Sequence, residues 1–160
     1  MSMAKDPDKK SKLTPKMVNK KAFHDYEIVE KVEAGMVLFG SEVKSLRAGG
    51  ADLGGSFARL SGDECWLIGC NIAIYPQAGD NNHEPIRKRK LLLHRRQITK
   101  IATRLTQRGF TLVPLRIFFN DRGLAKIEIA VAKGKRKYDK RDKITQHQQN
   151  KDMNRYRKLK

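Results

Sequence analysis

The sequence has few acidic residues, few cysteines and no long apolar segment. Its 17 Asp and Glu residues stand against 35 Lys and Arg residues, which gives a formal net charge of +18 over 160 residues. A field of this size opposes self-association and attracts polyanions. The shortage of acidic residues therefore argues against a typical acidic metabolic enzyme, and favours a nucleic acid or an anionic membrane surface as the partner.

The two cysteines, Cys65 and Cys70, lie in one short apolar run. The first residues have no apolar signal region, and the longest apolar stretches, GMVLFG and LLL, are too short to span a membrane. Two cysteines on one short strand are poorly placed to form a disulfide. We therefore expect reduced core thiols in a cytoplasmic protein without a membrane partner.

Recognisable catalytic and metal-binding patterns are also missing. Gly49 and Gly54 have the separation of a phosphate-binding loop, but position 55 is Gly where that loop needs Lys. The four histidines are scattered, without the spacing to the cysteines that a zinc site requires. The sequence thus predicts no enzyme activity, no metal and no cofactor.

The charge is concentrated in particular segments. Residues 1–18 carry a net charge of +3, and residues 134–160 carry eleven basic and three acidic residues, a net charge of +8. In the middle segment, 19–133, nine basic residues and no acidic residue lie between Ile86 and Arg108. We expect a flexible basic arm over 1–18, a folded RNA-binding domain over 19–133, and a basic tail over 134–160 that is disordered when free.

Alternating apolar residues predict short antiparallel strands. LVPLRIFFN and LAKIEIAVA alternate with a period of two around an Asn120–Gly123 turn, which predicts a hairpin. Val113, Leu115, Ile117 and Phe119 are expected to share one face of the first strand. YEIVEKVEAG, MVLFG, SFARL and ECWLIGC predict four more strands.

Two helices are expected between these strands. SEVKSLRAGG predicts a short helix capped by Ser41, and Ile98, Ile101, Ala102 and Leu105 form the apolar stripe of a second helix that Gly109 ends. Six short strands in about 115 residues predict a mainly β fold. We expect a small closed antiparallel barrel of the oligonucleotide-binding (OB) type with two or three short helices.

The segment RKRKLLLHRR is the strongest candidate for phosphate contact. Arg87, Lys88, Arg89 and Lys90 precede the second helix, and Arg95 lies in its first turn, where basic residues oppose the helix dipole. A solvated basic face is the simpler alternative, but nine basic residues without an acid favour RNA. For the tail, membrane-surface binding is the competing interpretation, weakened by its few bulky apolar residues.

Several motifs in order resemble the SsrA-binding protein (SmpB) family. They are NKKAFHDYEI, the EAG turn at Glu33–Gly35, GSEVKSLRAG, RKRKLLLHRR, GFTLVPL and AKGKRKYDKRD. The resemblance runs from Asn19 to Arg141, and it implies an OB-type barrel and an RNA-binding adaptor of ribosome rescue. Such a protein binds the tRNA-like domain of transfer-messenger RNA and promotes its delivery, with elongation factor Tu, to stalled ribosomes.

The resemblance also implies site residues. Asn19, Glu33 and Leu92 fall at positions associated with RNA binding, and the tail is expected to enter the decoding site and the empty mRNA channel. The RNA-binding set expected here is Asn19, Lys20, Lys21, Glu33, Lys44, Arg47, Arg87, Lys88, Arg89, Lys90, Leu92 and Arg95. The ribosome-binding set is Gly134, Lys135, Arg136, Lys137, Tyr138, Asp139, Lys140 and Arg141.

Two alternatives remain on sequence grounds. One is a generic ribosomal or single-strand-binding barrel protein, and the other is an RNA-modifying enzyme. Like-charged faces favour a monomer.

Overall fold

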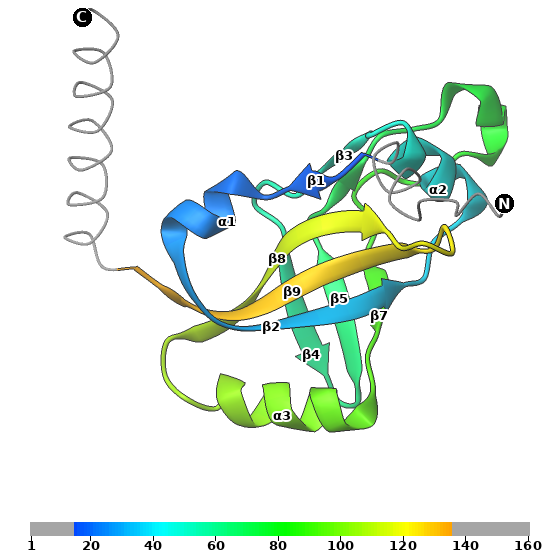
Figure 1. Cartoon of the computed structure of the whole chain (residues 1–160). Helices are drawn as coiled ribbons and strands as arrows, with labels where there is room; N and C mark the ends of the chain where they lie inside the picture. The colour runs from blue at the N-terminus through cyan, green and yellow to red at the C-terminus, as the bar shows by residue number, and fades with distance from the viewer. Residues whose placement is uncertain (1–14, 136–160) are drawn as a thin grey trace, which may run out of the picture.

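The computed structural model describes residues 15–135 of the chain. This part of the chain is mainly β, with three α-helices and one 3-10 helix (Figure 1). In chain order the elements are β1 (Met17–Val18), α1 (Lys20–Asp25), β2 (Tyr26–Met36), α2 (Gly40–Arg47), β3 (Ala51–Asp52), β4 (Phe57–Ser61), β5 (Glu64–Ile68), β6 (Asn71–Ile72), η2 (Pro76–Asn81), β7 (Arg89–Leu92), α3 (Arg95–Leu105), β8 (Phe110–Phe119) and β9 (Ala125–Gly134).

Six of the strands pair into a closed ring. The order is β8-β4-β5-β7-β2-β9, and β9 pairs back with β8, every pairing being antiparallel. β1 pairs with β8 at Arg116 and Ile117, further along the strand than β4, and β3 and β6 form a separate two-stranded sheet. A closed ring leaves few unpaired strand edges, which suits a small domain. α3 crosses one end of the ring, and α2 lies at the other (Figure 1).

The main core lies inside the ring. Alternate residues of several strands point into it, including Cys65 and Leu67 of β5 and Ile127 and Ile129 of β9, all fully buried. Ile101 closes the core from α3. Both cysteines are free thiols, as expected, and burial raises the pKa of each to about 11.

The expected β8–β9 hairpin is confirmed, but its facing pattern is only partly as expected. The Asn120–Gly123 turn joins the two strands, and Asn120 Oδ1 accepts hydrogen bonds from the amides of Arg122 and Leu124. The pairing shifts between Pro114 and Arg116. Because a bulge moves later side chains to the opposite face, Ile117 lies in the main core.

A second, smaller core lies on the other side of this hairpin. Val113 and Leu115 pack there with Ala22, Ala130 and Ala132. The expectation that Val113, Leu115, Ile117 and Phe119 share one face is therefore wrong. The bulge between Pro114 and Arg116 reverses the alternation, so Ile117 and Phe119 lie in the main core instead.

Several other elements differ from expectation. MVLFG is not a separate strand: β2 continues through Gly35 to Met36 and then leaves the sheet. The basic run expected to lead into the helix contains a strand, β7. No sequence pattern predicted α1, which Asn19 caps with its side chain.

The two longer helices were expected, with one wrong cap. α2 is preceded by Phe39 rather than Ser41, and the Glu42 carboxylate accepts a hydrogen bond from the Phe39 amide. After α2, Gly49 has a φ of +79°, which favours glycine at a helix end. α3 begins at Arg95, after His94.

Candidate nucleic-acid interface

A surface groove lies where three elements meet the β8–β9 turn. It has a volume of about 690 Å³ and opens beside the end of β2, the end of β7 and α2, which lie together on the right in Figure 1. Its lining residues are Gly35, Met36, Leu38, Val43, Arg47, Leu92, Leu93, His94, Gly123, Leu124, Ala125 and Lys126. Two residues of the expected RNA-binding set, Arg47 and Leu92, are among them.

Leu92 is held at the surface of the groove by the pairing of β2 with β7. It lies opposite Gly35 in the register and is 53% exposed. A Cβ atom at Gly35 would stand 3.3 Å from the Leu92 Cβ, so the glycine allows the leucine to lie against the strand. Leu124, 57% exposed, lines the same groove from the turn. Two exposed leucines thus give the groove an apolar floor that water solvates poorly.

Glu33 lies at the edge of the groove through its contact with Lys126. The Lys126 Nζ is 3.6 Å from Glu33 Oε1, and the Glu33 side chain is 54% exposed. In the β2–β9 register Glu33 stands opposite Glu128, whose own carboxylate pairs with Arg116 at 2.7 Å. Glu33 therefore presents an accessible acceptor beside a cation that lines the groove.

The two basic residues of α2 in the expected set have different surroundings. Arg47 lines the groove and its guanidinium lies 5.9 Å from the centroid of the Phe119 ring. The Lys44 ammonium lies 5.4 Å from the centroid of Tyr75, which precedes η2. Lys44 is exposed but does not line the groove.

Arg87 and Arg89 converge on one buried carboxylate. Glu42 of α2 is fully buried and accepts hydrogen bonds from Arg87 Nε at 2.8 Å, Arg87 Nη2 at 2.5 Å and Arg89 Nε at 2.8 Å. Arg89 is also fully buried, and its remaining donors go to the carbonyls of Cys70, Arg87 and Pro85. This interior position differs from the surface contact expected of Arg89, because its guanidinium has no exposed surface for a phosphate.

The Glu42 carboxyl has a lowered pKa. Burial acts against ionisation and would raise the pKa, but the hydrogen bonds from Arg87 and the Phe39 amide, and the charge and hydrogen bond of Arg89, outweigh it. The ionised cluster ties α2 to the start of β7. Arg87 is partly exposed, and its guanidinium lies 4.2 Å from the centroid of the Phe39 ring.

Lys88, Lys90 and Arg95 lie outside the core. Lys88, just before β7, is exposed, and Lys90 on β7 is partly exposed because side chains alternate along the strand from the buried Arg89. Lys90 forms a salt bridge with Glu64, and Arg95 is 3.3 Å from Asp63. Such exposed pairs contribute little to stability, about 0–1 kcal/mol, so breaking them to bind an external anion costs little.

Asn19, Lys20 and Lys21 lie apart from the groove. Asn19 is 6% exposed: its Nδ2 donates to the carbonyls of Leu53 and Pro114, and its Oδ1 accepts from the Ala22 amide. Its side chain therefore holds α1 against the ring. Lys20 and Lys21 are exposed on α1, and Lys21 lines a different hollow beside Tyr26.

Only the start of the expected tail set can be placed. Gly134 is the last residue of β9, and the Lys135 amide donates to the Asp25 carbonyl. These two residues therefore contact the folded part of the chain. Arg136, Lys137, Tyr138, Asp139, Lys140 and Arg141 lie outside the described residues.

Some of the groove residues had no direct functional signal in the sequence. Lys126 and Leu124 come from the expected hairpin, and Gly35 was noted only within the EAG turn of the family resemblance. The Asn120–Gly123 turn signal was the available clue, because it places Leu124 and Lys126 just after a hairpin tip. Within residues 15–135 there is no group of three potential metal ligands and no helix long and apolar enough to cross a bilayer.

A closed antiparallel ring with exposed basic side chains around an apolar groove defines a small β protein suited to binding a polyanion. The SmpB protein family model matches residues 16–159. The chain belongs to the SmpB family.

Individual relatives agree with this. An SsrA-binding protein of Symbiobacterium thermophilum is 47% identical over 90% of this chain and 91% of its own length. Another, of Sulfurihydrogenibium sp., is 53% identical over 86% and 87%. Among solved structures, a chain from a study of tmRNA-SmpB at the center of the bacterial ribosome has a TM-score of 0.67 and 46% identity. That match covers 82% of this chain and 95% of the other.

Proposed function

We propose that this chain binds transfer-messenger RNA and acts in trans-translation, the rescue of stalled ribosomes. The groove that brings Leu92 and Arg47 together, with Glu33 at its edge, carries the proposal. Membership of the SmpB family, whose named members are SsrA-binding proteins, supports the choice of RNA. The tRNA-like domain is the part of that RNA that we assign to the groove.

The chemistry of the groove suits a folded RNA. The Leu92 and Leu124 side chains offer apolar contact to a ribose or the face of an unstacked base. The Arg47 and Lys126 cations suit phosphates, and the exposed Glu33 carboxylate accepts hydrogen bonds from base amino groups or a 2′-hydroxyl. A site that combines a hydrogen-bond acceptor, cations and apolar side chains is expected to recognise the shape of a particular RNA, and not phosphate charge alone.

Finer features belong to the same proposal. The closed six-stranded ring is an OB-type barrel, and the buried Arg89 positions its neighbours Lys88 and Lys90 rather than contacting RNA itself. The chain is a cytoplasmic, monomeric adaptor and not an enzyme, and it meets elongation factor Tu through the RNA. Residues 136–160, with the Lys135 junction, enter the decoding site and the empty mRNA channel.

Leu92→Ser tests the groove. Removing a half-exposed leucine from an RNA contact is expected to weaken transfer-messenger RNA binding about tenfold, or about 1.4 kcal/mol. The measurement is a gel-shift titration in the presence of excess ordinary tRNA. Ile74→Ser is the matched control, because Ile74 is 56% exposed and does not line the groove.

Two outcomes contradict the proposal. If ordinary tRNA competes as well as unlabelled transfer-messenger RNA, the chain does not bind transfer-messenger RNA specifically. If Leu92→Ser and Ile74→Ser lose affinity equally, the groove is not the binding site.

A further inference from the structure

The outer face of β4 and β5, beside the residue that precedes β7, carries a second cluster that the groove does not explain. Arg59, Ser61, Trp66, Ile68 and Lys88 line a hollow of about 380 Å³ there, which we call the Trp66 face. This volume lies at the lower end of the range of about 300–1,000 Å³ that accommodates small organic groups. The Trp66 face shares no lining residue with the groove.

Strand alternation places Trp66 outside the core. Cys65 and Leu67, its neighbours on β5, are fully buried, whereas Trp66 is partly exposed. In the register Trp66 stands between Arg59 on β4 and Lys90 on β7. It belongs to neither hydrophobic core cluster. A large aromatic ring on the outside of a sheet therefore has room to stack on a flat partner.

The basic residues of the Trp66 face are mostly free of internal partners. Arg59 and Lys88 are exposed, and neither side chain forms an ion pair or hydrogen bond with another residue of the described range. The nearest carboxylate in the strand register, that of Glu64, is engaged by Lys90. The face thus combines an aromatic ring with two unneutralised cations.

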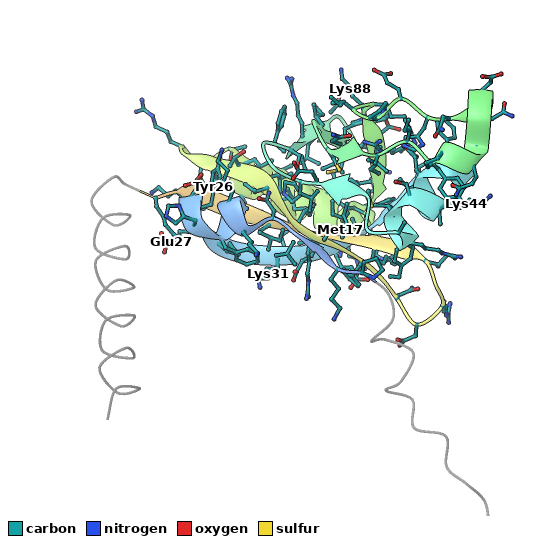
Figure 2. All side chains as sticks on the ribbon, turned by 90° about the horizontal axis from the view of Figure 1, so that it is seen from above. Met17, Tyr26, Glu27, Lys31, Lys44 and Lys88 are labelled. Carbon is teal, nitrogen blue, oxygen red and sulfur yellow. The ribbon has the colours of Figure 1, made fainter. Side chains whose placement is uncertain are left out.

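The backbone beneath Lys88 is held in place. Its two neighbours, Arg87 and Arg89, both bind the buried Glu42 carboxylate. Figure 2 shows Lys88 at the opposite edge of the molecule from Lys31. A cation on a fixed backbone beside an aromatic ring is the arrangement in which proteins stack a base and contact its phosphate.

We propose that the Trp66 face binds an unpaired RNA nucleotide, with its base stacked on the Trp66 indole and its flanking phosphates on Arg59 and Lys88. Stacking on a π face tolerates any base, so this site recognises single-stranded RNA without sequence preference. The inference is independent of the function proposed for the groove, because the two hollows share no lining residue and the RNA feature recognised differs.

The test uses the intrinsic fluorescence of the full chain, which contains one tryptophan. A hexanucleotide of adenosine is titrated into the protein, with binding followed separately by the anisotropy of a labelled copy. We expect saturable quenching of Trp66 emission that follows the anisotropy curve. Inorganic polyphosphate, which has charge but no base, is expected to bind without comparable quenching.

Variants separate stacking from general attraction. Trp66→Leu is expected to weaken hexanucleotide binding about tenfold, and Trp66→Phe, which retains a ring, to restore most of it. Arg59→Gln and Lys88→Gln should each weaken binding, so that the midpoint of the fluorescence quenching moves to a higher hexanucleotide concentration. Lys31→Gln is the matched control, since it removes one exposed cation from the opposite side. Thermal melting verifies that each variant is folded.

Three results overturn the inference. Hexanucleotide binding without any change in Trp66 emission would place the RNA elsewhere. An equal loss of hexanucleotide affinity in Lys31→Gln and Lys88→Gln would mean that binding depends only on the net charge of the protein. Quenching by hexaglutamate but not by the hexanucleotide would identify an acidic protein segment as the partner instead of RNA.

Discussion

At the scale of single residues, charge alone did not show which basic side chains face solvent. Arg87, Lys88, Arg89 and Lys90 form one run in the sequence, yet Arg89 is fully buried and Lys88 is exposed. The difference arises because side chains point alternately inward and outward around the start of β7. A run in which every residue is basic gives no sign of this alternation. Glu42 lay within the predicted short helix, and nothing local in the sequence indicated its two arginine partners more than 40 positions away.

Glu42→Gln tests the buried cluster. Removing one partner of a buried ion pair leaves the other charge without compensation, a loss of about 3–5 kcal/mol. We expect the free energy of unfolding, measured in urea at pH 7, to fall by about 3 kcal/mol or more. Glu64→Gln, which removes the partner of an exposed pair with Lys90, should cost less than about 1 kcal/mol. Equal losses in the two variants would contradict the structural role of the cluster.

The same substitution has a predicted pH dependence. The pKa of Glu42 is lowered in the folded protein from its ordinary value of 4.5. Its ionisation therefore stabilises the fold fully above about pH 4.5, and this contribution is lost as the pH falls through the lower folded value. The stability difference between wild type and Glu42→Gln should narrow in acid, as measured by urea titrations from pH 7 to pH 3. A constant difference over that range would contradict the prediction.

At the scale of elements, periodicity identified strands well where their alternation was unbroken. The β8–β9 hairpin and both longer helices were predicted from such patterns. The prediction failed at the β8 bulge. One extra residue there moves all later side chains of the strand to the opposite face of the sheet, and the composition of the segment does not change. The prediction also failed for α1, a helix of six residues that depends on the buried Asn19 cap and on contacts with β8.

Gly35→Ala tests how β2 shapes the groove. The new Cβ would stand 3.3 Å from the Leu92 Cβ, and the half-exposed leucine must shift by a few tenths of an ångström to accept it. Because Leu92 has open solvent beside it, we expect the melting temperature to change little. Transfer-messenger RNA affinity, measured by gel shift, should fall severalfold.

Gly40→Ala is the control for that experiment. No atom lies within 4 Å of a Cβ built at Gly40, and its φ is not positive. Unchanged RNA affinity in both variants would show that the position of Leu92 does not matter for binding.

At the scale of the whole molecule, the position of the charge is more informative than its total of +18. Residues 15–135 hold twenty-one basic and twelve acidic residues, arranged around a closed ring with a groove and a separate aromatic face. Residues 136–160 hold ten basic and three acidic residues. Composition predicted the class of partner, but only folding brings the β2 and β7 ends, α2 and the hairpin turn to one site.

Ending the chain after Lys135 separates the two charged parts. This cut keeps β9 intact, including the bond from the Lys135 amide to the Asp25 carbonyl, so the melting temperature should be nearly unchanged. For every phosphate that the protein no longer neutralises, the slope of log affinity against log salt concentration becomes shallower by roughly 0.7–0.9. The shortened chain should therefore bind non-specific RNA with a clearly smaller salt slope, while it still prefers transfer-messenger RNA over ordinary tRNA.

Peptide tagging on stalled ribosomes, followed in a reconstituted translation system, should fail. If the shortened chain loses the preference for transfer-messenger RNA, the groove is not sufficient for recognition; if tagging continues, the ribosomal contact is made by the ring itself.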